Sequence, residues 1–313
     1  MTSRSFGLTP KEVAALRSIR PGGASNKEIA AALCVSPPGL SRLSRSLESK
    51  GLISVRKAGT SHTAILSEMK HALRLRRVLD EHGHMKLERV LSLASLRVIT
   101  SIAASPGSTR GDIISSSGVS ARTLQKVLGD LKALGVLRIG SRGIYSISDR
   151  FAPIADFALE FGSYANQKAA LEFSPDSVIV WERGGEFIVK TKRAREDAGF
   201  RETAFSAFEA YGVPLLQDWH YYYHPCGEWR RTADEVLLQS LLISPLSTRE
   251  MIVILVFWEK NGLGKDVDRL REKARRYGRA SELESIIAYF EDPVKNRGPG
   301  FPRLSEVRAR LRG

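Results

Sequence analysis

The sequence predicts an α+β protein in which two copies of a helix–helix–hairpin unit precede a mixed domain with a helical last third. Three observations lead to this class. The excess of positive charge is confined to residues 1–150, and strand-like and helical patterns alternate after them. The third observation is a repeat: VSPPGLSRLSRSLESKGLISVRK is followed 84 residues later by VSARTLQKVLGDLKALGVLRIGS. The match has no gap and pairs Val35 with Val119, Leu40 with Leu124, Leu47 with Leu131 and Gly51 with Gly135.

The composition indicates a globular, cytoplasmic protein. The 313 residues are enough for two or three domains. The longest apolar run, MIVILVFW, is far shorter than the roughly 20 residues that cross a bilayer, so we expect no membrane partner. The first residues, MTSRSFGLTPKE, have no apolar signal core. Two cysteines fit a reducing compartment, and we expect a cytoplasmic, nucleoid-associated location.

Charge separates the chain into two parts. Residues 1–150 hold 24 Lys and Arg against 10 Asp and Glu, a net charge of +14. Residues 151–313 hold 24 of each kind, a net charge of zero. A basic part beside a neutral part favours a polyanion-binding module joined to something else.

In the first copy, EIAAALCV predicts a helix that begins near Asn26 and Lys27. A second helix is predicted to start after Ser36 as N-cap, with Pro37 in its first turn, and to end at Gly51 as a left-handed cap. Leu40, Leu43 and Leu47 mark its buried stripe. The opposite face is basic and rich in hydroxyl groups: Pro38, Ser41, Arg42, Arg45 and Ser49.

Two short β-like runs follow, LISVRK and TAILSE, and predict a hairpin with a polar tip at residues 58–62. Two helices and a basic hairpin form a winged helix-turn-helix, whose second helix enters the DNA major groove. From about Thr9 to Glu68 the chain resembles MarR-type and related prokaryotic winged-helix regulators. This resemblance implies the fold and a role as a DNA-binding regulator.

The second copy repeats the pattern with a shorter hairpin. Its first helix follows Thr109–Asp112 and buries Ile113. The second is predicted to bury Leu124, Val127, Leu128 and Leu131 and to expose Arg122, Gln125, Lys126 and Gly129. LRIGSRGIYSIS predicts the hairpin, with Arg138 and Arg142 near its Gly140–Gly143 tip. As a tandem pair, the copies resemble archaeal-type winged-helix regulators.

The predicted division has four parts: a first winged helix-turn-helix (1–68), a linker helix (69–92), a second winged helix-turn-helix (93–150) and an α+β regulatory or partner-binding domain (151–313). The linker helix is expected from near Glu68 to near Ser92, with a weak point at His82–His84.

The neutral part mixes both element types. FAPIADFALEFGSYANQKAALEF predicts one long helix or two, and SVIVWERGGEFIVKT predicts a hairpin. ETAFSAFEAYGV predicts a helix ending at Gly212, and VPLLQDWHYYYHP a strand in which the three tyrosines alternate between core and surface. Four helical patterns follow: TADEVLLQSLLIS, TREMIVILVFWEKN, DVDRLREKARRYG and ASELESIIAYFED. The tryptophans, all in this part, are expected in its core: Trp181, Trp219, Trp229 and Trp258.

From roughly Ser177 to Leu311 this part resembles the C-terminal region of archaeal winged-helix proteins related to AbiEi-type antitoxins. The resemblance lies in ETAFSAFEAYGVPL, HYYYHP, TADEVLLQSLL and the DVDRLREKARRYG and IIAYFED helices. Such antitoxins are partners of nucleotidyltransferase-like toxins. The resemblance therefore implies a regulatory or partner-binding role without catalytic residues.

Patterns typical of enzymes are incomplete, so we expect no enzyme and no cofactor. Gly162-Ser163 and Asp176 suggest a nucleotidyltransferase pattern, but the second metal-binding carboxylate is missing. His220, His224 and Cys226 are zinc ligand types on one strand face, yet a fourth ligand is missing, so no metal site is predicted.

The sequence therefore predicts a sequence-specific regulator of transcription that binds double-stranded DNA through two modules. Two alternatives stay open: an antitoxin-like protein that binds a toxin through its C-terminal domain and autoregulates, and a chromosome or replication-origin binding protein. Residues 151–313 are expected to form a homodimer or to bind a protein partner. The predicted DNA contacts are Ser36, Pro38, Ser41, Arg42, Arg45, Arg56, Lys57, Thr60, His62, Arg122, Gln125, Lys126, Arg138 and Arg142.

Overall fold

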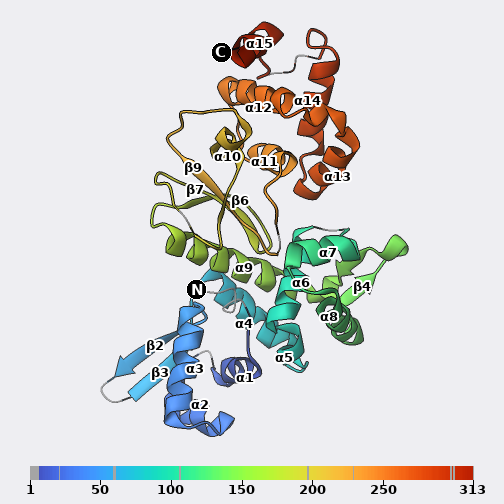
Figure 1. The fold of residues 1–313 in the computed structure, drawn as a ribbon. Coiled ribbons are helices and arrows are strands. Elements are labelled where there is room, and N and C mark those ends of the chain that lie inside the picture. The colour runs from blue at the N-terminus through green and yellow to red at the C-terminus, as the bar shows by residue number, and fades with distance from the viewer. Residues whose placement is uncertain are drawn as a thin grey trace. The chain divides into compact units, whose positions relative to one another are not determined.

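The structure, a computed structural model, is a mixed α+β fold, and the residues it describes form three antiparallel sheets (Figure 1). It describes residues 7–20, 22–58, 61–105, 107–195, 197–227, 229–296, 298 and 300–312, with the backbone alone at 57, 58, 61, 142 and 312. The predicted α+β class and helical last third are confirmed. The chain forms two compact units: unit 1 comprises Met1–Ala169 and Arg183–Gly185, and unit 2 comprises Ala170–Glu182 and Glu186–Gly313.

Unit 1 begins with α1 and the short strand β1, which were not predicted, and continues with the two helices and the hairpin predicted for the first copy. The capping boxes of Thr9 with Glu12 and of Ser25 with Glu28 start the first two helices. The sheet order is β1-β3-β2, and the two longer strands pair from Ile53 opposite Leu66 to Ala58 opposite Ser61. The elements are α1 (Pro10–Ser18), β1 (Ala24–Ser25), α2 (Asn26–Leu33), α3 (Pro37–Ser49), β2 (Ile53–Ala58) and β3 (Ser61–Leu66).

Two backbone positions with positive φ set the course of the chain around α3. Cys34 ends α2 with φ 50° and ψ 44°, and Gly51 follows α3 with φ 64°. Only the second position has the glycine that relieves this conformation. Ser36 takes the N-cap position of α3 as predicted, but its side chain makes no capping hydrogen bond.

The remainder of unit 1 is mostly helical. Its elements are α4 (Lys70–His82), α5 (Leu87–Val90), α6 (Leu93–Ala104), α7 (Arg110–Ser117), α8 (Ala121–Ala133), β4 (Leu137–Ile139), β5 (Tyr145–Ile147) and α9 (Ala152–Phe173), with 3-10 turns at Ser141–Gly143 and Asp149–Phe151. The last four residues of α9 fall in unit 2. The single linker helix expected over 69–92 is wrong, because α4 ends at His82 and Gly83 caps it.

Helices α7 and α8 follow α2 and α3 at a constant interval along the chain. α7 starts at 110 and ends at 117, against 26 and 33 for α2, an offset of 84. α8 spans 121–133 against 37–49 for α3, again an offset of 84. The left-handed positions are offset equally, Cys34 with Gly118 and Gly51 with Gly135.

One continuous apolar core lies inside unit 1. It includes Leu16 of α1, Leu47 of α3 and Leu124 of α8, all with at most 1% of their surface exposed. The first turns of α9 belong to the same core through Phe157 and Phe161. A chain cut at residue 150 would remove these aromatic rings, at a cost of several kcal/mol by the usual scale of about 3–5 kcal/mol per deleted core aromatic.

Unit 2 is a four-stranded sheet, in the order β6-β7-β9-β8, together with helices (Figure 1). The long helix α9, the hairpin and the four later helices are as predicted, whereas the helix expected to reach Gly212 is only one turn of α10 and a 3-10 turn at Glu209–Tyr211. β8 and α15 were not predicted. The elements are β6 (Val178–Arg183), β7 (Glu186–Thr191), β8 (Arg201–Glu202), α10 (Ala204–Ala207), β9 (His220–His224), α11 (Ala233–Ser240), α12 (Thr248–Lys260), α13 (Val267–Tyr277), α14 (Ala280–Glu291) and α15 (Leu304–Arg312), with a further 3-10 turn at Leu263–Lys265.

The alternation predicted for the three tyrosines of β9 is wrong. Tyr221, Tyr222 and Tyr223 are all buried, with 8%, 4% and 1% of their surface exposed. β9 pairs with β7 on one side and β8 on the other, so it is an inner strand. Tyr222 packs against Phe173 while its two neighbours join the helical core, so both faces of the strand are covered. Trp258 is buried in that core, and the other tryptophans pack partly buried against it.

None of the described helices is both long and apolar enough to cross a bilayer.

Candidate nucleic-acid interface

Helix α3 turns one face to the core and the other to solvent. Leu40 and Leu47 are buried, with 4% and 1% of their surface exposed, and Leu43 packs half-buried against the same core. The predicted contact residues lie on the outer side and are exposed: Ser36, Pro38, Ser41, Arg42 and Arg45. The structure therefore brings these five together on one helix, as the period of the leucines predicts.

A buried ion pair fixes the C-terminal end of α3 to α1. The Lys50 ammonium lies 2.6 Å from the Glu12 carboxylate, and their side chains are 8% and 2% exposed. Ser46 of α3 donates a second hydrogen bond of 2.7 Å to the same carboxylate. Burial alone raises the pKa of Glu12, but the bonds from Lys50, the Thr9 amide and Ser46 outweigh burial and hold that pKa below 4.5. The carboxylate is therefore charged at neutral pH.

The same helix end is held from α4 and α9. The Nε2 atom of His71 lies 2.9 Å from the carbonyl oxygen of Lys50. The His71 ring stacks on the Tyr164 ring, with 4.4 Å between the two ring centroids. Burial lowers the pKa of His71, so the ring is neutral at pH 7 and Nε2–H donates to the carbonyl. Lys168 donates to the Ser49 carbonyl at 2.9 Å. Three helices thus fix the orientation of α3, and its exposed face is presented on a rigid support.

A surface groove of about 560 Å³ runs between α2, α3 and the β2–β3 hairpin. Its lining carries hydrogen-bond donors from all three elements and a single carboxylate, that of Glu48. This composition suits a polyanion, because phosphate oxygens accept hydrogen bonds from lysine, arginine and hydroxyl groups. The lining residues are Asn26, Lys27, Ala30, Pro37, Leu40, Ser41, Ser44, Arg45, Glu48, Val55 and His62.

The two arginines of α3 occupy different places. Arg45 lines the groove and donates to the Ser41 hydroxyl at 3.1 Å, whereas Arg42 is exposed outside it. Neither forms an ion pair with any residue that the structure describes. Both guanidinium groups therefore keep donors for an external acceptor.

The hairpin adds predicted contacts at the edge of the groove. Arg56 is exposed on β2, and the half-buried His62 on β3 lines the groove. Lys57 pairs with His62 in the strand register, but only its backbone is described. Thr60 lies outside the described residues.

The second set of elements also presents basic side chains. Arg122, Gln125 and Lys126 are exposed on α8 as predicted. Arg138 on β4 donates to Asp149 at 3.3 Å, so part of its donor capacity is used within the chain. Only the backbone of Arg142 is described.

The groove also contains residues that the sequence prediction left out. Lys27 lies in the first turn of α2, and Ser44 lies one turn after Ser41 on α3. The signal for Ser44 was its helical spacing from Ser41. The signal for Lys27 was a cation at a predicted helix start, where a backbone N–H and a side chain can meet one phosphate.

Residues of the nucleotidyltransferase-like and zinc-like patterns form contacts with other parts of the chain. Asp176 accepts hydrogen bonds from Ser174, from Thr191 Oγ1 at 2.8 Å and from the Lys192 amide at 2.8 Å, and these bonds lower its pKa. His224 stacks on Phe187 at 4.8 Å. Within the described ranges, no three His, Cys, Asp or Glu side chains gather in a way that could hold a metal ion.

Comparison with known proteins agrees with the geometry of α1 to β2. Residues 8–58 match the sequence model of the MarR family, from the residue before the Thr9 cap to the end of β2. Proteins of this family bind double-stranded DNA as transcription regulators and generally are not enzymes. No curated protein matches the chain. The match supports a MarR-like, DNA-binding regulator.

Proposed function

We propose that the protein is a sequence-specific transcription regulator that places α3 in the major groove of double-stranded DNA. The observation that carries this proposal is the exposed face of α3, where Arg42 and Arg45 have no ion-pair partner among the described residues. An arginine in this position forms two hydrogen bonds with the O6 and N7 atoms of guanine. The MarR match over the same helix supports the assignment.

The groove beside α3 supplies the sequence-independent contacts. With α3 in the major groove, one DNA strand passes between α3 and the hairpin, where Lys27, Ser44 and His62 face it. Arg56 on the hairpin contacts phosphate or the minor groove. The net charge of +14 on residues 1–150 adds long-range attraction to DNA.

A second winged-helix module, formed by α6 to β5, is part of the proposal. The constant offset of 84 between helix bounds and the exposed Arg122, Gln125 and Lys126 of α8 support it. One chain with two such modules contacts two neighbouring groove segments, as a dimer of single modules does. The cytoplasmic, nucleoid-associated location, a homodimer and an antitoxin-like partner of unit 2 stay predictions of the sequence.

The test is a comparison of selected and random DNA with the full-length chain. Genome-wide footprinting identifies the preferred duplex, and fluorescence anisotropy at fixed salt then measures its Kd beside that of a scrambled duplex. We expect the preferred duplex to bind at least about 10³-fold more tightly, the lower end for specific regulators. Equal affinity for the two duplexes would contradict sequence-specific regulation.

A further inference from the structure

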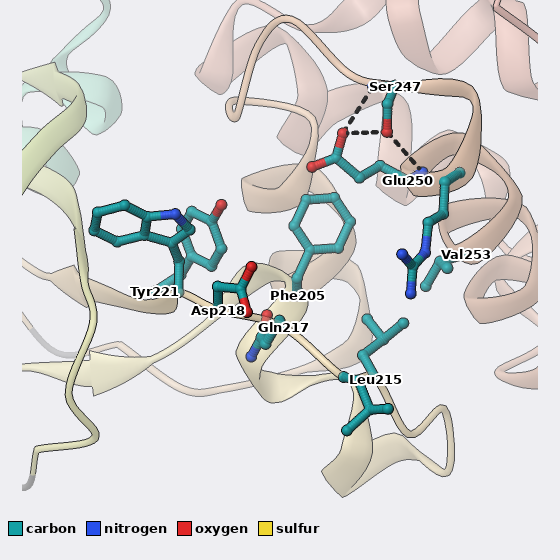
Figure 2. A pocket seen from close by; sticks show the side chains of 11 residues that line it. Phe205, Leu215, Gln217, Asp218, Tyr221, Ser247, Glu250 and Val253 are labelled. Atoms are coloured by element: carbon teal, nitrogen blue, oxygen red, sulfur yellow. Dashed lines mark hydrogen bonds between the residues drawn. The ribbon is translucent and has the colours of Figure 1, made fainter.

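Unit 2 contains a pocket of about 250 Å³ between α10, residues 215–219 before β9 and the start of α12 (Figure 2). Aromatic and aliphatic side chains form its walls. In the view of Figure 2 the Phe205 ring lies between the Ser247–Glu250 pair and the Asp218 carboxylate. The lining residues are Phe205, Leu215, Leu216, Gln217, Asp218, Trp219, Tyr221, Ser247, Arg249, Glu250 and Val253.

Hydrogen-bond acceptors in this pocket are left without partners. Gln217 donates through Nε2 to Ser206 at 2.8 Å, but its buried Oε1 has no partner in the described part of the chain. Glu250 uses Oε2 to cap α12 by accepting from the Ser247 amide and hydroxyl, both at 2.7 Å. Its Oε1 and the Asp218 carboxylate form no hydrogen bond or ion pair with the described residues. Of these acceptors only Gln217 Oε1 is buried without a partner, which is costly and would be relieved by a bound donor; Glu250 is half-buried and Asp218 is exposed.

The exposed guanidinium of Arg249 lines the same pocket and is also unpaired. Arg249 makes no ion pair with Asp218, Glu250 or any other residue in the described ranges. Opposite charges that line one pocket without pairing with each other suit a ligand that carries both charges. The guanidinium group binds a carboxylate through two parallel hydrogen bonds. The acceptors of Gln217 and Asp218 suit the three N–H donors of an ammonium group.

We propose that this pocket binds a free α-amino acid with an apolar side chain. Arg249 holds its carboxylate, Gln217 Oε1 and Asp218 hold its ammonium group, and Phe205 and Val253 contact its side chain. The volume of about 250 Å³ equals that of about eight water molecules at roughly 30 Å³ each, which fits a ligand of about eight to twelve non-hydrogen atoms. The tyrosine hydroxyl of Tyr221 stays protonated, because burial and the neighbouring Glu250 raise its pKa, and it adds a neutral donor.

This inference goes beyond the proposed function, because it concerns unit 2 alone and does not depend on DNA binding by unit 1. The test titrates the full-length chain with L-valine, L-leucine, L-methionine and L-phenylalanine by calorimetry. We expect at least one of them to bind. The analogues of that amino acid without the carboxylate or without the amino group should bind at least about tenfold more weakly, since each lacks one charge-assisted contact.

Variants separate this site from binding elsewhere. Asp218→Asn and Arg249→Gln should each weaken binding at least about tenfold, because each removes one charge from the pocket lining. Glu259→Gln is the matched control. Glu259 is exposed on α12, the helix that carries Arg249, but lies outside the pocket, so this variant should leave affinity unchanged. The proposal is overturned if none of the four amino acids binds, if an analogue with one charge binds equally well, or if the control variant weakens binding as much as Asp218→Asn. If the chain bound the preferred and the scrambled DNA duplex equally well, the amino-acid binding result for this pocket would be unaffected.

Discussion

The buried Glu12–Lys50 pair is the contact on which the position of α3 depends, so Glu12→Gln is the most informative change to the fold. The amide of glutamine retains an acceptor for Ser46, but the charge that neutralises Lys50 is lost. Lys50 has only 8% of its side chain exposed and cannot reach bulk water without moving α3. The variant therefore leaves an ammonium group uncompensated inside unit 1.

The expected cost follows from that burial. Removal of one partner of a buried pair costs about 3–5 kcal/mol. Because the hydrogen bond from Ser46 remains, we expect a loss at the lower end of this range, about 3 kcal/mol of unfolding free energy. For a unit of this size, that loss lowers the melting temperature by about 6–12 °C. Glu12→Gln combined with Lys50→Met removes the uncompensated charge and should recover part of this loss.

The dependence on pH has a defined sign. The pKa of Glu12 is lower in the folded protein than its usual value of 4.5, so the folded state favours the charged form. The stabilisation is complete above pH 4.5 and is lost as the pH falls through the lowered pKa. The difference in unfolding free energy between wild type and Glu12→Gln should therefore shrink below pH 4.5.

The assay follows the two units separately. All four tryptophans lie in unit 2, so tryptophan fluorescence follows that unit, while far-UV circular dichroism follows both. Unit 1 contributes to the dichroism transition but not to the fluorescence transition. We expect Glu12→Gln to lower the midpoint temperature of that contribution and to leave the fluorescence midpoint unchanged. A loss below about 1 kcal/mol, or a difference from wild type that stays constant down to pH 3, would refute the argument from burial.

Three further predictions concern the hairpin, the α3 cap and unit 2. Arg56→Ala should weaken binding to preferred and random duplexes alike and lower the slope of log K against log salt by about one unit, as a salt titration would show. Gly51→Ala should destabilise unit 1 by about 3 kcal/mol in thermal unfolding, because φ is 64° and the added methyl group would lie 3.0 Å from the Tyr164 ring, which stacks on His71; Gly135→Ala, which meets nothing nearer than 3.9 Å, should cost about 1 kcal/mol. Glu186→Gln should lower unit 2 stability by about 3 kcal/mol by tryptophan fluorescence, because fully buried Glu186 lies 3.1 Å from Arg276; an unchanged transition would contradict this.

Local signals in the sequence predicted the elements that carry the candidate interface. The spacing of Leu40, Leu43 and Leu47 placed the arginines on the opposite face of α3, and Gly51 marked its end. These predictions were correct because periodicity and caps depend on residues a few positions apart. The break between α4 and α5 was also visible as a weak point at Gly83, but helical patterning on both sides led to one expected helix.

Features that depend on distant parts of the chain could not be predicted in this way. Glu12 and Lys50 are 38 residues apart, and each alone resembles a surface charge. The burial of all three tyrosines of β9 depends on β7 and β8 as its neighbours and on cover over both faces. A lysine at a helix start was visible in the sequence, but its position in the groove depends on how the fold brings the start of α2 beside α3 and the hairpin.

The central claim is that α3 contacts base edges, and Arg45→Ala tests it most directly. The full-length variant is titrated against the preferred and the random duplex over a range of salt concentrations, with Arg230→Ala as the control that removes one exposed positive charge from unit 2. The account predicts that Arg45→Ala costs about 1–3 kcal/mol on the preferred duplex, changes binding to the random duplex far less and relaxes the choice of base at one position. Equal weakening on both duplexes would contradict it, because Arg45 would then contact only the phosphate backbone.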